Sequence, residues 1–168
     1  MRLTKDPVLY KKATQNLLAQ IDALHLSPEK RDKAIHFVKL FREAFTKEEV
    51  KKATALANHK DNVWDLGYDS AGFCRVASIS FMMLMDFHDW DLMAVDKDKG
   101  QWYYSHHYLR HKETGKIFDL TYDQFLSQVP YKAGEVVKPG SFLNDETNVF
   151  AKSIGIDLMK AITETKGK

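Results

Sequence analysis

Three residue types that can form a cysteine nucleophile follow one another along the chain. The single cysteine, Cys74, ends the segment Ser-Ala-Gly-Phe-Cys, where we expect the first turn of a helix. The adjacent His106 and His107 follow, and then Asp119. A thiol attacks as its thiolate, and a usual pKa near 8.5 leaves only ~5% of it ionised at neutral pH. A helix N-terminus, an imidazole and an orienting carboxylate together increase that fraction. The three residue types therefore predict nucleophilic catalysis at Cys74.

Each of these residues also has a simpler interpretation when taken alone. A lone cysteine on an apolar helix face is usually an inert buried residue. Histidines on a hairpin strand are usually solvated. The combination is more informative, because Asp119 lies between Phe118 and Leu120, where a charge is costly without a partner.

The length of one hairpin loop decides which histidine faces Asp119. Neighbouring strand residues point to opposite faces, so we expect only one of His106 and His107 to serve. A four-residue loop, 112–115, makes His106 the diagonal neighbour of Asp119. A three-residue loop, 113–115, gives that place to His107. Turn chemistry favours the shorter loop, a type I turn followed by a glycine bulge, but the pattern leaves both histidines open.

The longer segments that contain or follow these residues give a second indication of function, a resemblance to known proteins. They are Gly-Phe-Cys-Arg-Val-Ala-Ser (72–78), His-His-Tyr-Leu (106–109), Phe-Asp-Leu-Thr-Tyr-Asp-Gln-Phe (118–125), Tyr-Lys-Ala-Gly (131–134) and Gly-Ser-Phe-Leu (140–143). Together they resemble the transglutaminase-like, papain-like cysteine superfamily, including its small bacterial and phage members. The resemblance covers roughly residues 70–143, and Gln124 and Phe125 make it specific.

The resemblance implies a role for each matching residue. Cys74 takes the place of the nucleophile and Asp119 that of the carboxylate. His106 takes the histidine place because Tyr108 then occupies the aromatic position two residues later, and His107 remains the alternative. The implied activity is that of a hydrolase or acyltransferase acting on an amide (a peptidase, amidase, deamidase or transglutaminase) through a thioester. The implied substrate is a protein, a peptide or a small amide, and no metal or organic cofactor is needed.

Local signals predict three helices in the first third of the chain. Pro7 suits the first turn of one helix, and Ser27 followed by Pro28 suits the start of a second. Thr46 and Glu49 have the spacing of a capping box that opens a third helix, which runs towards residue 58.

The whole pattern predicts one α+β domain over residues 1–168. Residues 1–60 form its helical N-terminal part, 70–143 its papain-like core and 145–164 a C-terminal helix. Within the core, a central helix from Ser70 to about residue 86 carries Cys74 and packs on a small antiparallel sheet. The expected strands are 91–96, 101–111 and 116–120.

Composition limits the classes of partner. A net charge of +2 with 29% charged residues gives no single-sign stripe, so nucleic acid is not an expected partner. One cysteine excludes an internal disulfide and every cysteine-rich zinc motif. His107 and His111 would lie ~13 Å apart on a strand, too far for one zinc ion. No signal peptide or membrane span is expected, which favours the cytoplasm. The oligomeric state is left open.

A non-catalytic protein is the competing interpretation. The same fold could have relaxed active-site geometry and hold a protein or a nucleic acid, either in its cleft or on an aromatic strand surface. The reactivity of Cys74 separates the two interpretations, because only an active site needs an ionised thiol. The residues of that aromatic surface are Trp102, Tyr103, Tyr104, Tyr108, Arg110 and Lys112.

Overall fold

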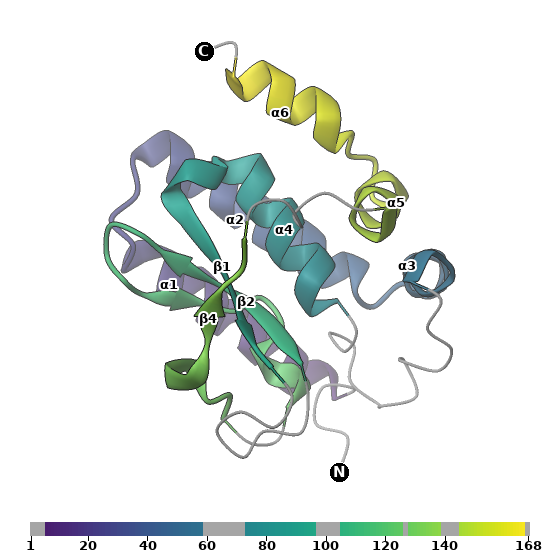
Figure 1. Cartoon of the computed structure of the whole chain (residues 1–168). Helices are drawn as coiled ribbons and strands as arrows, with labels where there is room; N and C mark the ends of the chain where they lie inside the picture. The colour runs from purple at the N-terminus through teal and green to yellow at the C-terminus, as the bar shows by residue number, and fades with distance from the viewer. Residues whose placement is uncertain (1–5, 59–72, 97–104, 126–127, 139–144, 167–168) are drawn as a thin grey trace.

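The computed structural model describes residues 6–58, 73–96, 105–125, 128–138 and 145–166, and combines helices with a four-stranded antiparallel sheet (Figure 1). The expected α+β class is confirmed. The helices are α1 (Pro7–Asp22), α2 (Pro28–Ala44), α3 (Glu48–Asn58), α4 (Cys74–Met85), α5 (Asp145–Ser153) and α6 (Leu158–Lys166). The strands are β1 (Trp90–Val95), β2 (His106–His111), β3 (Ile117–Phe118) and β4 (Glu135–Val136), with short 3-10 turns η3 (Phe87–Asp89), η5 (Tyr122–Gln124) and η6 (Tyr131–Ala133).

Helix α4 is the centre of the fold. Every side chain from Val76 to Met85 is buried, as expected for a helix that is apolar on all sides. One side of α4 packs on β2 and β1, and α2, α5 and α6 contact it elsewhere (Figure 1). The prediction of a central, buried helix that carries Cys74 is therefore confirmed.

Two of the expected helix starts are confirmed in detail. Pro7 is at the first position of α1, and Asp6 caps that helix by accepting a hydrogen bond from the Val8 N–H at 2.9 Å. The Ser27 hydroxyl caps α2. Helix α3 begins near the expected place, but the Thr46 hydroxyl donates to the Glu43 carbonyl at 2.7 Å. Thr46 thus bonds to the end of α2.

Two helix boundaries differ from expectation. The central helix begins at Cys74 and not at Ser70, which lies outside the described residues. The single C-terminal helix is in fact two helices. Gly155 has a φ of +80°, which ends α5, and the Ile156 N–H returns to the Ala151 carbonyl at 2.9 Å. The side chain of Asp157 then caps α6. Glycine supplies a left-handed backbone at little steric cost, which the apolar periodicity does not reveal.

The sheet has the strand order β3-β2-β1-β4, and its register settles the hairpin. Leu109 pairs with Phe118, so the loop is the four residues 112–115 and the preference for a shorter loop is wrong. Gly115 is in the left-handed region at φ +71°, and its N–H donates to the His111 carbonyl at 2.8 Å. A hydrogen bond between the His111 ring and Thr114 within the loop also supports the longer turn. The expected strand residues 101–104 lie outside the described part.

Candidate functional site

Cys74 is the first residue of α4, and its position favours a negative charge on the sulfur. Phe73 precedes it at the N-cap and has no side-chain acceptor for the N–H groups of the first turn. Free N–H groups at a helix N-terminus attract an anion. Cys74 is partly exposed. The Ser78 hydroxyl donates to the Cys74 carbonyl at 2.6 Å, which ties the second turn of the helix to the first.

The structure brings Cys74, His106 and Asp119 together. The four-residue hairpin loop makes His106 the diagonal neighbour of Asp119 on one face of the sheet. Nε2 of His106 lies 2.6 Å from Oδ2 of Asp119, and both side chains are buried. The same imidazole also lowers the pKa of the Cys74 thiol. The chain therefore has a thiol, an imidazole and a carboxylate in series.

His107 also acts on the pKa of Cys74, which sequence reasoning did not anticipate. We expected only one of the two adjacent histidines to be in place, because they point to opposite faces of β2. Both histidines lower the pKa of the Cys74 thiol. His106 is the first residue of β2 and His107 the second, so both histidines lie at one end of the strand. His107 is partly exposed, whereas His106 is fully buried.

The pKa values of the thiol and the imidazole move in opposite directions. Burial raises the pKa of Cys74, but hydrogen bonds and charges from His106 and His107 outweigh it and lower the pKa to about 5. Burial lowers the pKa of His106, but the charge and hydrogen bond of Asp119, together with Cys74, raise it to about 10. Between these two values the thiolate and the imidazolium are the stable pair.

Asp119 has further hydrogen-bond donors that sequence reasoning missed. The Tyr131 hydroxyl donates to Oδ2 at 2.8 Å, and the Thr121 N–H donates to Oδ1 at 3.2 Å. These bonds stabilise a carboxylate that is only 4% exposed. Burial raises the pKa of Tyr131, and the nearby Asp119 charge raises it further, so its hydroxyl stays a donor. The only signal for Tyr131 in the sequence was its place in the segment 131–134.

Tyr108 and Gly134 hold Tyr131 in position. The Tyr108 hydroxyl donates to the Tyr131 carbonyl at 3.0 Å, and the two rings meet edge to face. A Cβ atom at Gly134 would lie 1.8 Å from the Tyr108 hydroxyl oxygen. Glycine is required at position 134 because of this close approach and not because of its φ, which is −73°.

Replacing Tyr131 with phenylalanine is expected to lower the free energy of unfolding by ~1.5–3 kcal/mol, because the lost bond goes to a buried charge. Tyr108→Phe is the matched control: it removes a hydroxyl that bonds only to a backbone carbonyl and should cost ~0.5–1.5 kcal/mol. Urea denaturation of both variants measures the difference. Equal losses would contradict a special role for the bond to Asp119.

Gln124 and Phe125, which made the family resemblance specific, both contact His106. Nε2 of Gln124 lies 3.4 Å from Nδ1 of His106 and 2.9 Å from the Thr121 hydroxyl. The Phe125 ring meets the imidazole edge to face, with 4.8 Å between ring centroids. The two side chains therefore limit rotation of the buried ring.

A buried ion pair attaches the N-terminal helices to this loop. Arg42 of α2 is 1% exposed and forms two hydrogen bonds with the Asp123 carboxylate, at 2.7 and 2.8 Å. Its Nη1 also donates to the Leu120 carbonyl at 3.2 Å. Asp123 is the neighbour of Gln124, so α2 supports the segment that contacts His106. Sequence reasoning gave this part of the chain no role in the site.

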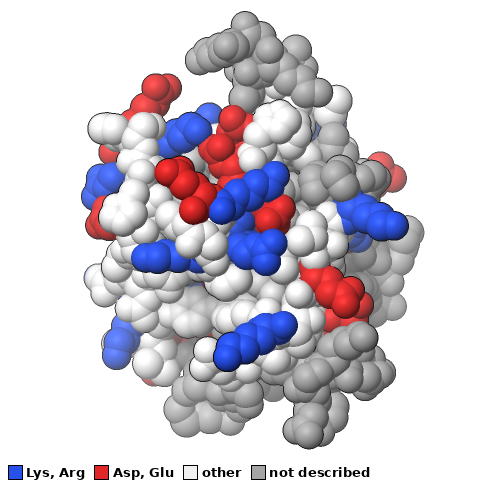
Figure 2. Space-filling view, turned by 60° about the vertical axis from the view of Figure 1, so that its left-hand side comes forward, with Lys and Arg blue, Asp and Glu red and all other residues white. Residues whose placement is uncertain are grey.

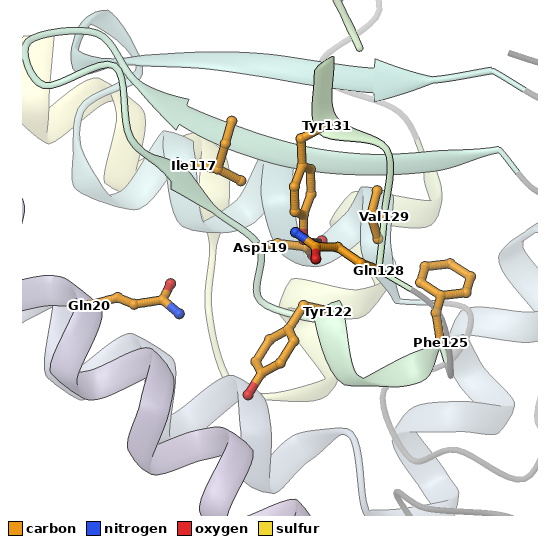
Figure 3. Close-up of a pocket in the computed structure, with 8 residues that line it drawn as sticks. All are labelled: Gln20, Ile117, Asp119, Tyr122, Phe125, Gln128, Val129 and Tyr131. Carbon is orange, nitrogen blue, oxygen red and sulfur yellow. Dashed lines mark hydrogen bonds between the residues drawn. The ribbon is translucent and has the colours of Figure 1, made fainter. Parts of the chain in front are cut away.

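A pocket of about 480 Å³ lies beside Asp119, and Figure 3 shows its lining. Asp119 and Tyr131 border it, and Gln20 of α1 lies across from them. Neither Cys74 nor either histidine lines this pocket, so it lies beside the carboxylate and not over the sulfur. The remaining lining residues are Ile117, Tyr122, Phe125, Gln128 and Val129.

The charged side chains in one view of the described residues are of mixed sign. On the face in Figure 2, Lys and Arg side chains are interspersed with Asp and Glu. Within the described ranges, no three His, Cys, Asp or Glu side chains form a group that could hold a metal ion. None of the helices there is both long enough and apolar enough to cross a membrane.

Comparison of the chain with models of known protein families, with curated proteins and with solved structures finds no match.

Proposed function

We propose that this protein is a cysteine hydrolase that cleaves an amide through a thioester intermediate, with Cys74 as nucleophile, His106 as acid and base, and Asp119 as the orienting carboxylate. One observation carries the proposal. The His106 imidazole, which lowers the pKa of the Cys74 thiol, is itself held at 2.6 Å by a buried carboxylate. A papain-like or transglutaminase-like core is part of the proposal, supported by the sequence segments described above.

The chemistry follows from the ion pair. The Cys74 thiolate attacks the carbonyl carbon of the substrate, and the carbonyl oxygen takes the negative charge. The His106 imidazolium then gives its proton to the leaving amine, the C–N bond breaks, and a thioester remains. Water attacks the thioester while His106 accepts one of its protons, which releases a carboxylic acid and restores the thiolate; the acid then loses its proton to solvent. Asp119 keeps the ring in one tautomer throughout.

Water and an amine are the two possible acceptors of the acyl group. Hydrolysis needs only one bound substrate, which favours it over transfer to an amine. A peptide, a glutamine side chain or a small amide all present the same carbonyl to the sulfur. The substrate class is therefore to be identified with probes that place one reactive group on peptide, glutamine-amide and ester scaffolds.

The pH dependence of Cys74 alkylation by iodoacetamide tests the proposal. The folded protein should react half-maximally near pH 5, because the thiolate forms above its pKa of about 5 and is lost as the pH falls through that value. The protein unfolded in urea is the control, and its midpoint should return to about 8.5. Cys74→Ser should not react, because the chain has no other thiol.

A folded-state midpoint at or above about 8 would contradict the proposal. Labelling that requires denaturation would favour the alternative, in which this fold binds a protein or a nucleic acid without catalysis. Retention on immobilised nucleic acid that is lost with added salt would support that alternative directly.

A further inference from the structure

The two nitrogens of the His106 ring have different partners. Nε2 lies 2.6 Å from Oδ2 of Asp119, and the Tyr131 hydroxyl donates to the same oxygen at 2.8 Å. An ionised carboxylate only accepts hydrogen bonds, so Nε2 keeps its hydrogen whether the ring is neutral or charged. Nδ1 is therefore the nitrogen at which the ring gains or loses a proton.

Nδ1 faces the side-chain amide of Gln124. The amide nitrogen of Gln124 lies 3.4 Å from Nδ1 and 2.9 Å from Oγ1 of Thr121. It carries two hydrogens, so it can donate to both partners at once. The Phe125 ring meets the imidazole edge to face, with 4.8 Å between centroids, and limits how far that ring can turn away. This arrangement fits a neutral ring, whose Nδ1 has a free lone pair.

A protonated ring does not fit the same arrangement. Nδ1 then carries a hydrogen, and the amide nitrogen of Gln124 would bring a second donor to it. Rotation of the amide by about 180° places Oε1 at Nδ1 instead. The Thr121 hydroxyl both donates and accepts, so it can reverse its bond to the amide at the same time. Among side chains of this length, only glutamine offers a donor and an acceptor at neutral pH.

We infer that Gln124 is a positioning residue whose amide turns over each time His106 gains or loses the proton on Nδ1. The inference rests on the proposed function, in which His106 gives a proton to the leaving amine and later takes one from water. Oε1 accepts from the imidazolium before the first transfer, and the amide nitrogen donates to the neutral ring after it. No proton moves to or from Gln124. Side-chain rotations are much faster than usual turnover, so this motion does not limit the rate.

Gln124 differs from the ionisable groups around the ring. Burial lowers the pKa of His106, but Asp119 and Cys74 raise it to about 10, so the resting ring carries the proton. Tyr108 stacks on the imidazole with 6.1 Å between centroids, and burial raises the pKa of its hydroxyl to about 12, so it stays neutral. The amide of Gln124 has no charge, so it can support both states of the ring without favouring either.

Titration of the His106 ring by nitrogen NMR in a Cys74→Ala chain tests this role without the thiol. In Gln124→Met, which loses donor and acceptor together, the ring pKa should move by less than ~0.5 pH units, because both states lose a bond. A fixed donor favours the neutral ring, so its loss would raise the pKa, whereas loss of a fixed acceptor would lower it. Gln124→Glu keeps only acceptors and should raise the ring pKa by about 1–3 pH units.

Urea denaturation of the same chains tests whether the amide bonds to the ring in both states. Gln124→Met should lower the urea midpoint by the same amount about 1 pH unit below and above the measured ring pKa. A loss on one side only would indicate a fixed donor or a fixed acceptor. Gln15→Met, at an exposed glutamine of α1, is the matched control and should change neither the urea midpoint nor the ring pKa.

In the chain that keeps Cys74, p-nitrophenyl acetate separates acylation from deacylation. The thiolate attacks the ester carbonyl and releases p-nitrophenolate, a leaving group that needs no proton, so the initial burst measures acylation. The steady rate measures hydrolysis of the acetyl thioester, which needs a neutral His106 as base. Gln124→Glu should lower this rate by about 10-fold or more, because each unit of higher ring pKa lowers the neutral fraction tenfold, and should change acylation by less than ~3-fold. Subtracting the rate of Cys74→Ala removes reaction at other residues.

Three results would overturn the inference. They are a ring pKa that moves by about 1 pH unit or more in Gln124→Met, an unchanged urea midpoint in that variant, and equal losses of acylation and deacylation in Gln124→Glu. Circular dichroism of each variant checks folding separately. A wild-type thiol that is not alkylated below about pH 7 would contradict the proposed function itself. The titration in Cys74→Ala does not depend on the thiol, so the two failures are distinguishable.

Discussion

In a His106→Ala variant, the midpoint of Cys74 alkylation moves upward by about 3 pH units. The folded thiol has a pKa of about 5 although burial alone would raise it; hydrogen bonding by His106 is the largest effect that lowers the pKa, followed by that of His107. Without that ring, burial acts against His107 alone, and the pKa returns towards its ordinary value. Alkylation rates measured from about pH 4 to about pH 10 determine the midpoint.

The rate at a single pH is a poor substitute for this midpoint. A thiolate of higher pKa is also a stronger nucleophile, which offsets part of the lost ionised fraction. His36→Ala, a histidine on α2 outside the site, serves as the control and should leave the midpoint unchanged. If His107→Ala abolishes the low midpoint while His106→Ala retains it, the assignment of the two histidines is reversed.

Replacing Arg42 with leucine is expected to lower the free energy of unfolding by ~3–5 kcal/mol, because it removes the arginine that pairs with the largely buried Asp123 carboxylate. The variant also loses three hydrogen bonds that the Arg42 guanidinium donates to the Thr14 hydroxyl and to the Tyr10 and Leu120 carbonyls. Urea denaturation followed by circular dichroism measures the loss.

Arg31 provides the matched control on the same helix. It pairs with Asp22 at 2.7 Å, the same distance as the Arg42 pair, but its side chain is 45% exposed. Arg31→Leu should therefore lower the free energy of unfolding much less than Arg42→Leu does. Replacing both Arg42 and Asp123 with apolar residues should recover part of the loss, since no charge remains buried. Equal costs for the two arginines would contradict the importance of burial.

Features set by a few adjacent residues could be predicted from the sequence. Pro7 and the Ser27–Pro28 pair indicate helix starts because their effects act within one turn. The apolar composition of α4 indicates burial without reference to any other element. The break at Gly155 was missed because an apolar period can continue across a glycine, and only the backbone conformation there ends the helix.

The geometry of the candidate site was harder to predict. Its hairpin register depended on one loop residue, and turn preferences alone selected the wrong loop, since they do not include the contact between His111 and Thr114. Alternation along a strand places His106 and His107 on opposite faces, but it did not indicate that both act on the pKa of Cys74. At the end of a strand, residues on opposite faces of the sheet can border the same space, which the alternation of faces does not describe.

Contacts between residues far apart in the sequence were the hardest to predict. Arg42 and Asp123 are 81 positions apart, and no local sequence pattern near either residue indicates that the two form an ion pair. Tyr131 reaches Asp119 from 12 positions away, across a turn that no periodic pattern predicts. Such bonds depend on how whole elements pack, so residue spacing cannot supply them.

The close approach between Gly134 and Tyr108 links two positions that are 26 residues apart. One added methyl group at 134 would overlap the phenol oxygen, which lies 1.8 Å from where that methyl carbon would be. A homologous chain can therefore carry a larger residue at 134 only if the residue at 108 is shorter than tyrosine. The two positions are constrained to covary, and an exchange at one becomes tolerable only after an exchange at the other.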